Sequence, residues 1–236
     1  MSENIHSKHR DRVRKELLAH GFDSETPPHK ILEMLLFYSI PRKDTNEIAH
    51  ELINKFGSIE AVLKARPEEL LKVSGVGENT VAHFKLMLSI CYRIINDNNA
   101  KIKKFKNTEE IYEYLLGKYF NCNKEMIGIT SLSGNGRLLG FDVVGEGDIS
   151  SVGVSIREIA EVVIKRNAAS VILSHNHPGA SAVPSIDDIV TTERIYKALA
   201  DMNVVLLDHI IIAENDFVSF NQTAQLRYIF KHQKEE

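Results

Sequence analysis

Cysteine and tryptophan are scarce in this chain, whose 236 residues include Cys91, Cys122 and no tryptophan. Two cysteines are too few for a disulfide framework or a cysteine-rich zinc site, so we expect two thiols in a reducing compartment. Long apolar runs are missing too, and the first residues, MSENIHSKHRDRVRKELL, lack the apolar core of a signal peptide. These absences lead us to expect a cytoplasmic protein with no membrane partner.

A strong excess of either charge is also absent, since the net charge of the whole chain is −3. The charge is divided unevenly. Residues 1–106 hold 18 Lys and Arg against 14 Asp and Glu, a net of +4, and the remainder holds 11 against 18, a net of −7. A mildly basic part joined to an acidic part suggests two domains, of which only the first suits a polyanion.

Residues 1–100 are predicted to form an all-helical domain, because apolar residues recur at helical spacing and no alternating strand pattern occurs. Helices are expected over residues 7–20, 28–39, 47–56, 59–65 and 67–73. The polar and basic run NDNNAKIKKFK, residues 96–106, is predicted to be a solvated linker. The second domain is then expected over residues 107–230.

The most informative piece of the first domain is LLKVSGVGENTVAHFKLML, residues 70–88, which resembles a helix-hairpin-helix. Gly75 and Gly77 allow a tight turn and expose N–H groups at the start of the next helix. Such a helix start can bind phosphate without reading bases, with Lys72 and Lys85 as candidate supports. The alternative is that the turn packs the two helices or serves a protein partner, and sequence-independent DNA contact stays one of two open interpretations.

The second domain is predicted to be α+β, a mixed sheet with flanking helices. Helices are expected over residues 109–120, 157–167 and 185–202. Strands are expected over 125–132, 137–147, 149–156, 169–173, 204–213 and 216–222, with a hairpin turn at 133–136.

Two imidazoles and a carboxylate come together in the stretch SHNHPGASAVPSIDD, residues 174–188. The short apolar run before it is predicted to be a buried strand that ends near His175 and His177. Residues two apart on a strand point the same way, so the two imidazoles would share one face. Ser185 is expected to be a helix N-cap, with Asp188 in the capping-box position in the first turn.

Two histidines, one aspartate and a water form the open tetrahedral set that is typical of catalytic zinc, so Zn²⁺ is the expected cofactor. Two other interpretations stay open. The three residues could be ordinary polar groups at a strand end and a helix start. They could also bind a non-haem iron, which uses the same residue types.

The spacing H-x-H-P, then Ser after seven residues and Asp after two more, resembles the JAMM (MPN-plus) metalloprotease motif, with His175, His177, Ser185 and Asp188 in its positions. The segments HNHPGASAVPSIDDIVTT and LLDHIII, together with the helical first domain, resemble the RadC family more narrowly. The resemblance implies a JAMM/MPN-like fold, which is cytidine-deaminase-like, and a zinc metallopeptidase acting on a protein or peptide substrate. The chain lacks a long insertion, so ubiquitin is not implied. The competing hypothesis is a DNA-binding repair or recombination protein with an auxiliary metal or nuclease site.

The resemblance also implies a glutamate that transfers protons. In JAMM proteins this glutamate precedes the first long strand in an E-x-x-G-like context, which residues 125–128, EMIG, match. Glu125 is therefore the expected general acid/base, with Glu146 as the rival, and Ser185 is expected to donate to the oxyanion. Asp208 and His209 lie between apolar runs, where unpaired burial is costly. They are expected either to orient a metal ligand or to form a structural pair with Arg157 or Glu158.

Overall fold

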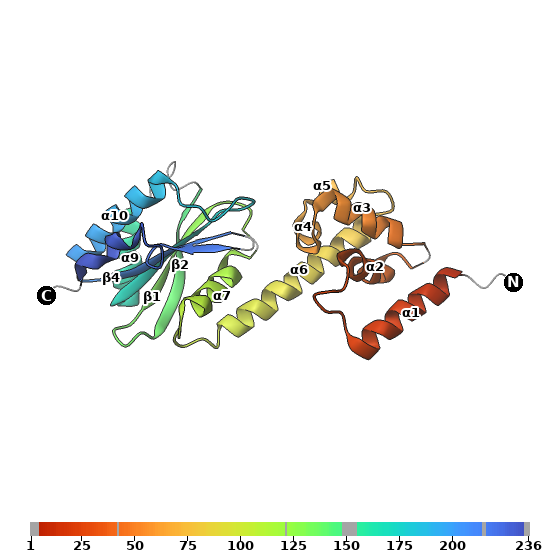
Figure 1. The fold of residues 1–236 in the computed structure, drawn as a ribbon, viewed down its shortest axis with the longest axis horizontal. Helices are drawn as coiled ribbons and strands as arrows, with labels where there is room; N and C mark the ends of the chain where they lie inside the picture. The colour runs from red at the N-terminus through yellow and green to blue at the C-terminus, as the bar shows by residue number, and fades with distance from the viewer. Residues whose placement is uncertain (1–4, 42, 121, 148–154, 214–215, 234–236) are drawn as a thin grey trace. The chain divides into compact units, whose positions relative to one another are not determined.

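The computed structural model describes residues 5–41, 43–120, 122–147, 155–213 and 216–233. The chain divides into two compact units that meet in the sequence between Arg93 and Ile94. The first consists of helices, and the second contains a sheet with helices on its faces (Figure 1). The predicted α+β class, with N-terminal helices followed by a mixed sheet, is confirmed.

The described part of the first unit is built from amphipathic helices around an apolar core. The helices are α1 (Ile5–His20), α2 (Pro28–Ser39), α3 (Asn46–Phe56), α4 (Ile59–Lys64), α5 (Pro67–Leu70) and α6 (Glu78–Asn99), whose last six residues belong to the second unit. Its largest fully buried side chains include Leu32, Leu52 and Phe84. Ser58 caps α4 by accepting from the N–H of Ala61, which satisfies a donor that the helix start leaves unpaired.

The second unit contains a five-stranded sheet in the order β2-β1-β3-β4-β5. Its elements are α7 (Thr108–Tyr119), β1 (Met126–Leu132), β2 (Leu138–Glu146), α9 (Ile156–Arg166), β3 (Ser170–Asn176), α10 (Ile186–Asp201), β4 (Val205–Ile212), β5 (Phe217–Ser219) and the 3-10 helix η1 (Arg227–Gln233). Strands β3 and β4 are parallel, and the other neighbouring pairs are antiparallel. The central strand β3 is therefore hydrogen-bonded on both sides.

The two faces of the sheet are covered by different helices, with α9 and α10 over one and α7 over the other (Figure 1). Alternate residues of β3 follow this division. Val171 and Leu173 belong to the core cluster that includes α9 and α10 residues, and Ile172 belongs to the cluster of α7. His175 continues the first series, so its side chain points to the α9 and α10 face.

Several boundaries differ from those expected. Helix α5 ends at Leu70 instead of residue 73, β5 ends at Ser219 instead of residue 222, and α6 continues to Asn99, into the run 96–106 that was expected to be a linker. Strand β3 runs to Asn176 instead of ending at Leu173, because its ladders to β1 and β4 continue through His175. The strand expected over 149–156 falls mostly outside the described residues, and its last two residues instead begin α9, with Ser155 as N-cap. Among the described helices, none is long and apolar enough to cross a membrane.

Candidate functional site

The two histidines of the H-x-H pair are held at the end of the central strand β3. His175 pairs with Ile127 of β1 and with Ile211 of β4, and its side chain is 1% exposed. His177 lies just beyond the strand, where its backbone N–H donates to the oxygen of Ile212 at 2.8 Å. Asn176 points the other way and ties the start of β1, since its Oδ1 accepts from the N–H of Met126 at 2.8 Å. The strand therefore aims both imidazoles to one side, as predicted.

The carboxylate comes from the start of α10, where Ser185 and Asp188 form the predicted capping box. Oδ2 of Asp188 accepts from both the N–H and the hydroxyl of Ser185, each at 2.7 Å. The N–H of Asp188 donates in return to Oγ of Ser185 at 3.1 Å. These bonds leave the other oxygen, Oδ1, facing Nε2 of His175 at 3.3 Å. Asp188 is 3% exposed, so its carboxylate is held in place and shielded from water.

The three side chains converge on one point. Nε2 of His175 lies 2.9 Å from Nε2 of His177, and the ligand atoms of the two histidines and Asp188 all lie within 4.8 Å of one another. Nitrogen and oxygen ligands of a tetrahedral zinc lie about 3.3 Å apart, because each is about 2.0–2.1 Å from the metal. The measured distances fit a metal site after small side-chain shifts.

The hydrogen bond of His177 to the backbone fixes which of its nitrogens can bind a metal. Nδ1 of His177 lies 2.8 Å from the carbonyl oxygen of Ser181. A carbonyl can only accept, so Nδ1 carries the hydrogen and a neutral ring keeps its lone pair on Nε2. That lone pair is directed at the atoms contributed by His175 and Asp188. A lone pair and a buried carboxylate in one place call for a cation, which supports a metal at this point.

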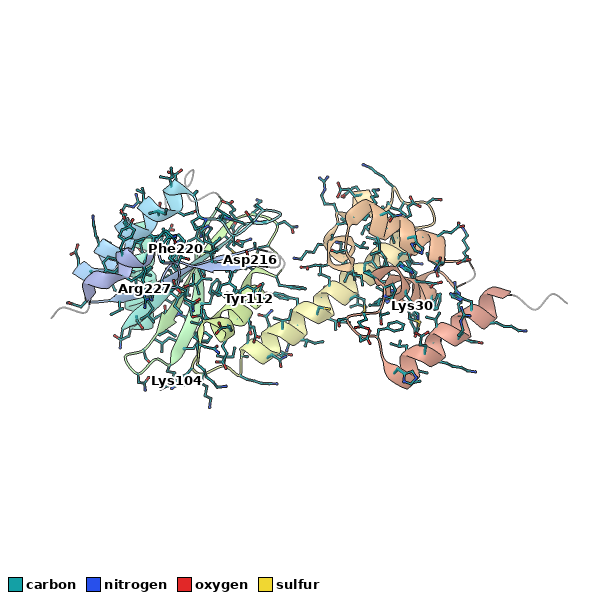
Figure 2. All side chains as sticks on the ribbon, in the orientation of Figure 1. Lys30, Lys104, Tyr112, Asp216, Phe220 and Arg227 are labelled. Carbon is teal, nitrogen blue, oxygen red and sulfur yellow. The ribbon has the colours of Figure 1, made fainter. Side chains whose placement is uncertain are left out.

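His209 lies behind His175, a contact that the sequence left open. Nε2 of His209 is 2.8 Å from Nδ1 of His175, and Nδ1 of His209 is 2.6 Å from the hydroxyl oxygen of Thr192. The ring is fully buried beside Phe220, labelled in Figure 2, with the ring centres 4.5 Å apart. Burial, together with the nearby His175 and His177, lowers the pKa of His209 well below its usual value. His209 is therefore a neutral imidazole that contacts the candidate ligand His175.

Asp208 has a different role from its neighbour because the two side chains leave β4 on opposite faces. Its carboxylate accepts from the hydroxyl of Ser219 at 2.5 Å and from the N–H of Asn221 at 2.9 Å. Arg157, one of the expected partners, instead donates to Glu161 at 3.1 Å. Asp208 thus anchors the chain after β5, and of these two neighbours His209 is the one that contacts a candidate metal ligand, His175.

Strand alternation assigns the two candidate glutamates, Glu125 just before β1 and Glu146 at the end of β2, to different faces of the sheet. Ile127 pairs with His175, and paired residues of antiparallel strands point the same way. The oxygen of Glu125 accepts from the N–H of Gly147 at 2.7 Å, so the β1 ladder continues one step before Met126. Alternation then puts Glu125 on the face of His175, whereas Glu146, which pairs with Met126, belongs to the other face.

A second candidate site is an open hollow of about 640 Å³ in the first unit. Its lining joins the end of α2 to the hairpin turn, residues 71–77, and to the first turn of α6: Ser39, Ile40, Pro41, Lys43, Gly75, Gly77, Glu78, Asn79 and Thr80. Of the two expected basic supports, Lys85 is occupied elsewhere, because its ammonium donates to the oxygens of Leu63 at 2.8 Å and Ala65 at 2.6 Å. Lys72 is exposed and lies outside this lining.

Comparison with known proteins identifies the family to which the chain belongs. A family model described as "RadC-like JAB domain" matches residues 105–226, the part that contains both strand β3 and helix α10. A UPF0758 protein of Fusobacterium nucleatum is 37% identical over 93% of this chain and 97% of its own length. A UPF0758 protein of Alteromonas mediterranea is 32% identical over 92% of this chain and 96% of its own length. The chain therefore belongs to the RadC family and carries a RadC-like JAB domain.

Proposed function

We propose that this protein is a zinc-dependent hydrolase of peptide or isopeptide bonds, with His175, His177 and Asp188 as the metal ligands. The observation that carries the proposal is the convergence of two imidazole nitrogens and one carboxylate oxygen within 4.8 Å. A set of three protein ligands leaves a coordination position for a reactant, as in catalytic zinc sites. The JAB domain match favours a zinc hydrolase over an iron oxygenase with the same ligand types.

When bound, zinc would supply a positive charge that acidifies water and polarises a carbonyl group. Hydrolysis of an amide also needs a base for the proton of the attacking water and an acid for the leaving amine. We assign both roles to Glu125, because strand alternation puts it on the face of His175. Glu146, on the other face, is the matched residue that would lack this role.

Ser185 would stabilise the oxyanion of the reaction. Its hydroxyl proton is donated to Oδ2 of Asp188 in the structure, so the O–H must turn to reach a substrate. Oδ2 would keep the backbone N–H of Ser185 as a donor after that rotation. Ser185 is exposed, as a residue that meets a substrate must be. Removing one such donor typically lowers kcat by about 10²–10³-fold.

The test is a cleavage screen of zinc-loaded protein against a mixed peptide library and isopeptide-linked peptides. Glu125→Gln is expected to retain zinc and to lose activity by about 10²–10⁴-fold, the range for a general acid/base. Glu146→Gln is the control and is expected to keep the activity of the wild type. A loss in Glu146→Gln with full activity in Glu125→Gln would overturn the assignment, and no cleavage by the zinc-loaded wild type would count against the hydrolase itself.

A second function, sequence-independent contact of the first unit with DNA, is favoured by the hollow at the hairpin turn. Lys43, Gly75 and Gly77 line one concave surface together with the first turn of α6. The start of a helix offers N–H groups and a partial positive charge, which suit a phosphate. In this alternative the metal site would be auxiliary.

Gly77 is the position to change in order to test this contact. A side chain at Gly75 would come within 2.7 Å of Ile48 and would need a positive φ, whereas a Cβ at Gly77 meets nothing within 4 Å. Gly77→Val should therefore fold, screen the helix start and weaken binding to a random-sequence DNA duplex at low salt. Affinity equal to that of the wild type in the folded variant would remove the hairpin turn from the account.

A further inference from the structure

The hydroxyl of Thr192 connects a metal ligand to the buried His209. Its oxygen lies 2.5 Å from the backbone oxygen of Asp188 and 2.6 Å from Nδ1 of His209. Two oxygens this close need a hydrogen between them, and a carbonyl cannot supply it. The single proton of Thr192 therefore points to Asp188, a bond that threonine commonly makes within helices. The hydroxyl oxygen is then an acceptor towards His209, which must carry its hydrogen on Nδ1.

The position of this hydrogen determines which nitrogen of His209 accepts and which nitrogen of His175 donates. A neutral imidazole with a hydrogen on Nδ1 has a lone pair on Nε2. Nε2 of His209 therefore accepts from Nδ1 of His175, 2.8 Å away. His175 in turn keeps its lone pair on Nε2, the atom that faces Oδ1 of Asp188 at 3.3 Å and Nε2 of His177 at 2.9 Å.

We propose that Thr192 and His209 are positioning residues that hold His175 in the tautomer able to bind a metal through Nε2. This inference rests on the proposed metal site and adds the residues that prepare it. His177 reaches the same tautomer by a shorter route, its bond to the carbonyl of Ser181. His175 is buried in the strand and obtains its acceptor from a side chain of the neighbouring parallel strand.

The reverse order of hydrogens would disable the site. If Thr192 donated to His209, Nε2 of His209 would carry the hydrogen and donate to Nδ1 of His175. Nε2 of His175 would then carry a hydrogen and could not bind a metal. Thr192 and His209 are both fully buried, so the direction is set by the protein itself. The hydrogen bond from Thr192 to the carbonyl of Asp188 thus selects the metal-binding order.

The first test compares zinc affinity in two variants of Thr192 that differ in the hydroxyl. Thr192→Val keeps the shape and removes the acceptor for His209, whereas Thr192→Ser keeps the hydroxyl. Loss of a hydrogen-bond partner behind a metal ligand typically weakens affinity by about 10–100-fold, which is the result expected for Thr192→Val. Thr192→Ser is expected to restore wild-type affinity. Equal affinity of wild type and Thr192→Val would overturn the proposal and leave the zinc site itself intact.

The second test reads the tautomer directly, by two-bond ¹H–¹⁵N correlation spectra of histidine-labelled, metal-free protein. The spectra are recorded at about pH 8.5, where an ordinary imidazole is neutral. Wild type should carry a hydrogen on Nδ1 of His175, donated to His209, and Thr192→Val should lose the hydrogen at that nitrogen. A proton that takes the place of the metal between Nε2 of His175 and Nε2 of His177, 2.9 Å apart, does not alter this readout. A side chain that only fills space would not move this hydrogen.

The two proposals fail in distinguishable ways. A wild type that binds no zinc contradicts the proposed function, and the tautomer of His175 still tests the hydrogen-bond chain. A wild type with no hydrogen on Nδ1 of His175 overturns the chain whether or not zinc binds. If Thr192→Val does not fold, the wild-type spectrum alone still tests the hydrogen-bond chain.

Discussion

Ser185 donates its backbone N–H and its hydroxyl to one oxygen of Asp188, Oδ2, each at 2.7 Å. The other oxygen, Oδ1, faces Nε2 of His175 at 3.3 Å. One oxygen of the Asp188 carboxylate thus takes part in the capping box of α10, and the other faces the candidate metal position. The helix cap orients the proposed ligand.

Replacing Ser185 with alanine should therefore affect stability and zinc binding together. Loss of an N-cap hydroxyl typically costs about 1 kcal/mol of the free energy of unfolding. We also expect zinc affinity to fall by about 10-fold or more, because Asp188 loses a partner that orients it. Urea denaturation and zinc titration measure the two effects.

Ser155→Ala is the matched control in the same unit, because Ser155 caps α9 by accepting from the N–H of Glu158 at 3.3 Å. It should lose similar stability and keep the zinc affinity of the wild type. Equal losses of zinc affinity in the two variants would show that the Ser185 effect is one of general stability.

Gly128 is required by packing at the start of β1. A Cβ at this position would lie 2.3 Å from Cζ of Phe141 and 2.8 Å from the hydroxyl of Tyr119. Gly128→Ala should lower the free energy of unfolding by about 1–3 kcal/mol, the usual cost of overpacking. Gly134→Ala, whose Cβ would meet its nearest neighbour at 3.8 Å, should be tolerated in the same urea titration. Equal stability of the two variants would contradict this packing.

The burial of Asp208 predicts a pH dependence of stability. Burial raises the pKa of this carboxyl above its ordinary value, although Ser219 and backbone N–H groups donate to it. A group with a raised folded-state pKa stabilises the fold most below its unfolded-state pKa of about 3.9, and this contribution is lost as pH rises through the folded-state value.

Asp208→Asn removes this titration and isolates its effect. Relative to Asp208→Asn, the wild type should lose stability as the pH rises above about 4, the unfolded-state pKa, towards the raised folded-state pKa. Urea denaturation at several pH values measures the difference. A difference that stays constant with pH would contradict a raised pKa.

Variants of Lys43 and Lys85 distinguish an effect on DNA binding from an effect on the stability of the first unit. Lys43 lines the hollow at the hairpin turn, and Lys43→Ala should weaken binding to DNA of any sequence and reduce the salt slope by about 1. The ammonium of Lys85 donates to two carbonyls at the end of α4, so Lys85→Met should lower stability by about 1–3 kcal/mol.

DNA affinity and its salt slope should remain those of the wild type in Lys85→Met. The opposite pattern, with DNA affinity lost in Lys85→Met and kept in Lys43→Ala, would exclude the hollow as the contact.

The sequence predicted the local relations within the candidate metal site, because each of them follows from spacing along the chain. Strand alternation gave the shared side of His175 and His177, and the N-cap spacing of Ser185 and Asp188 gave the capping box. These relations involve residues close in the chain, where spacing determines geometry.

The role of His209 could not be assigned in the same way, because it depends on which strands are neighbours. Its contact with His175 follows from the parallel pairing of β3 with β4 and from their register, in which Leu173 is opposite His209. The signal in the sequence was an imidazole inside an apolar strand. Its partner became identifiable only when the fold brought Thr192 and His175 to either side of the ring.

The most direct test of the account is the metal content of protein purified without a chelating tag, in wild type beside His177→Ala and Asp188→Ala. The convergence of three ligand side chains predicts about one zinc per wild-type chain, bound through a site of catalytic type. Both variants should lose the zinc and remain folded. Wild-type protein that holds no metal after zinc is added would contradict the proposed metal site and the hydrolase built on it.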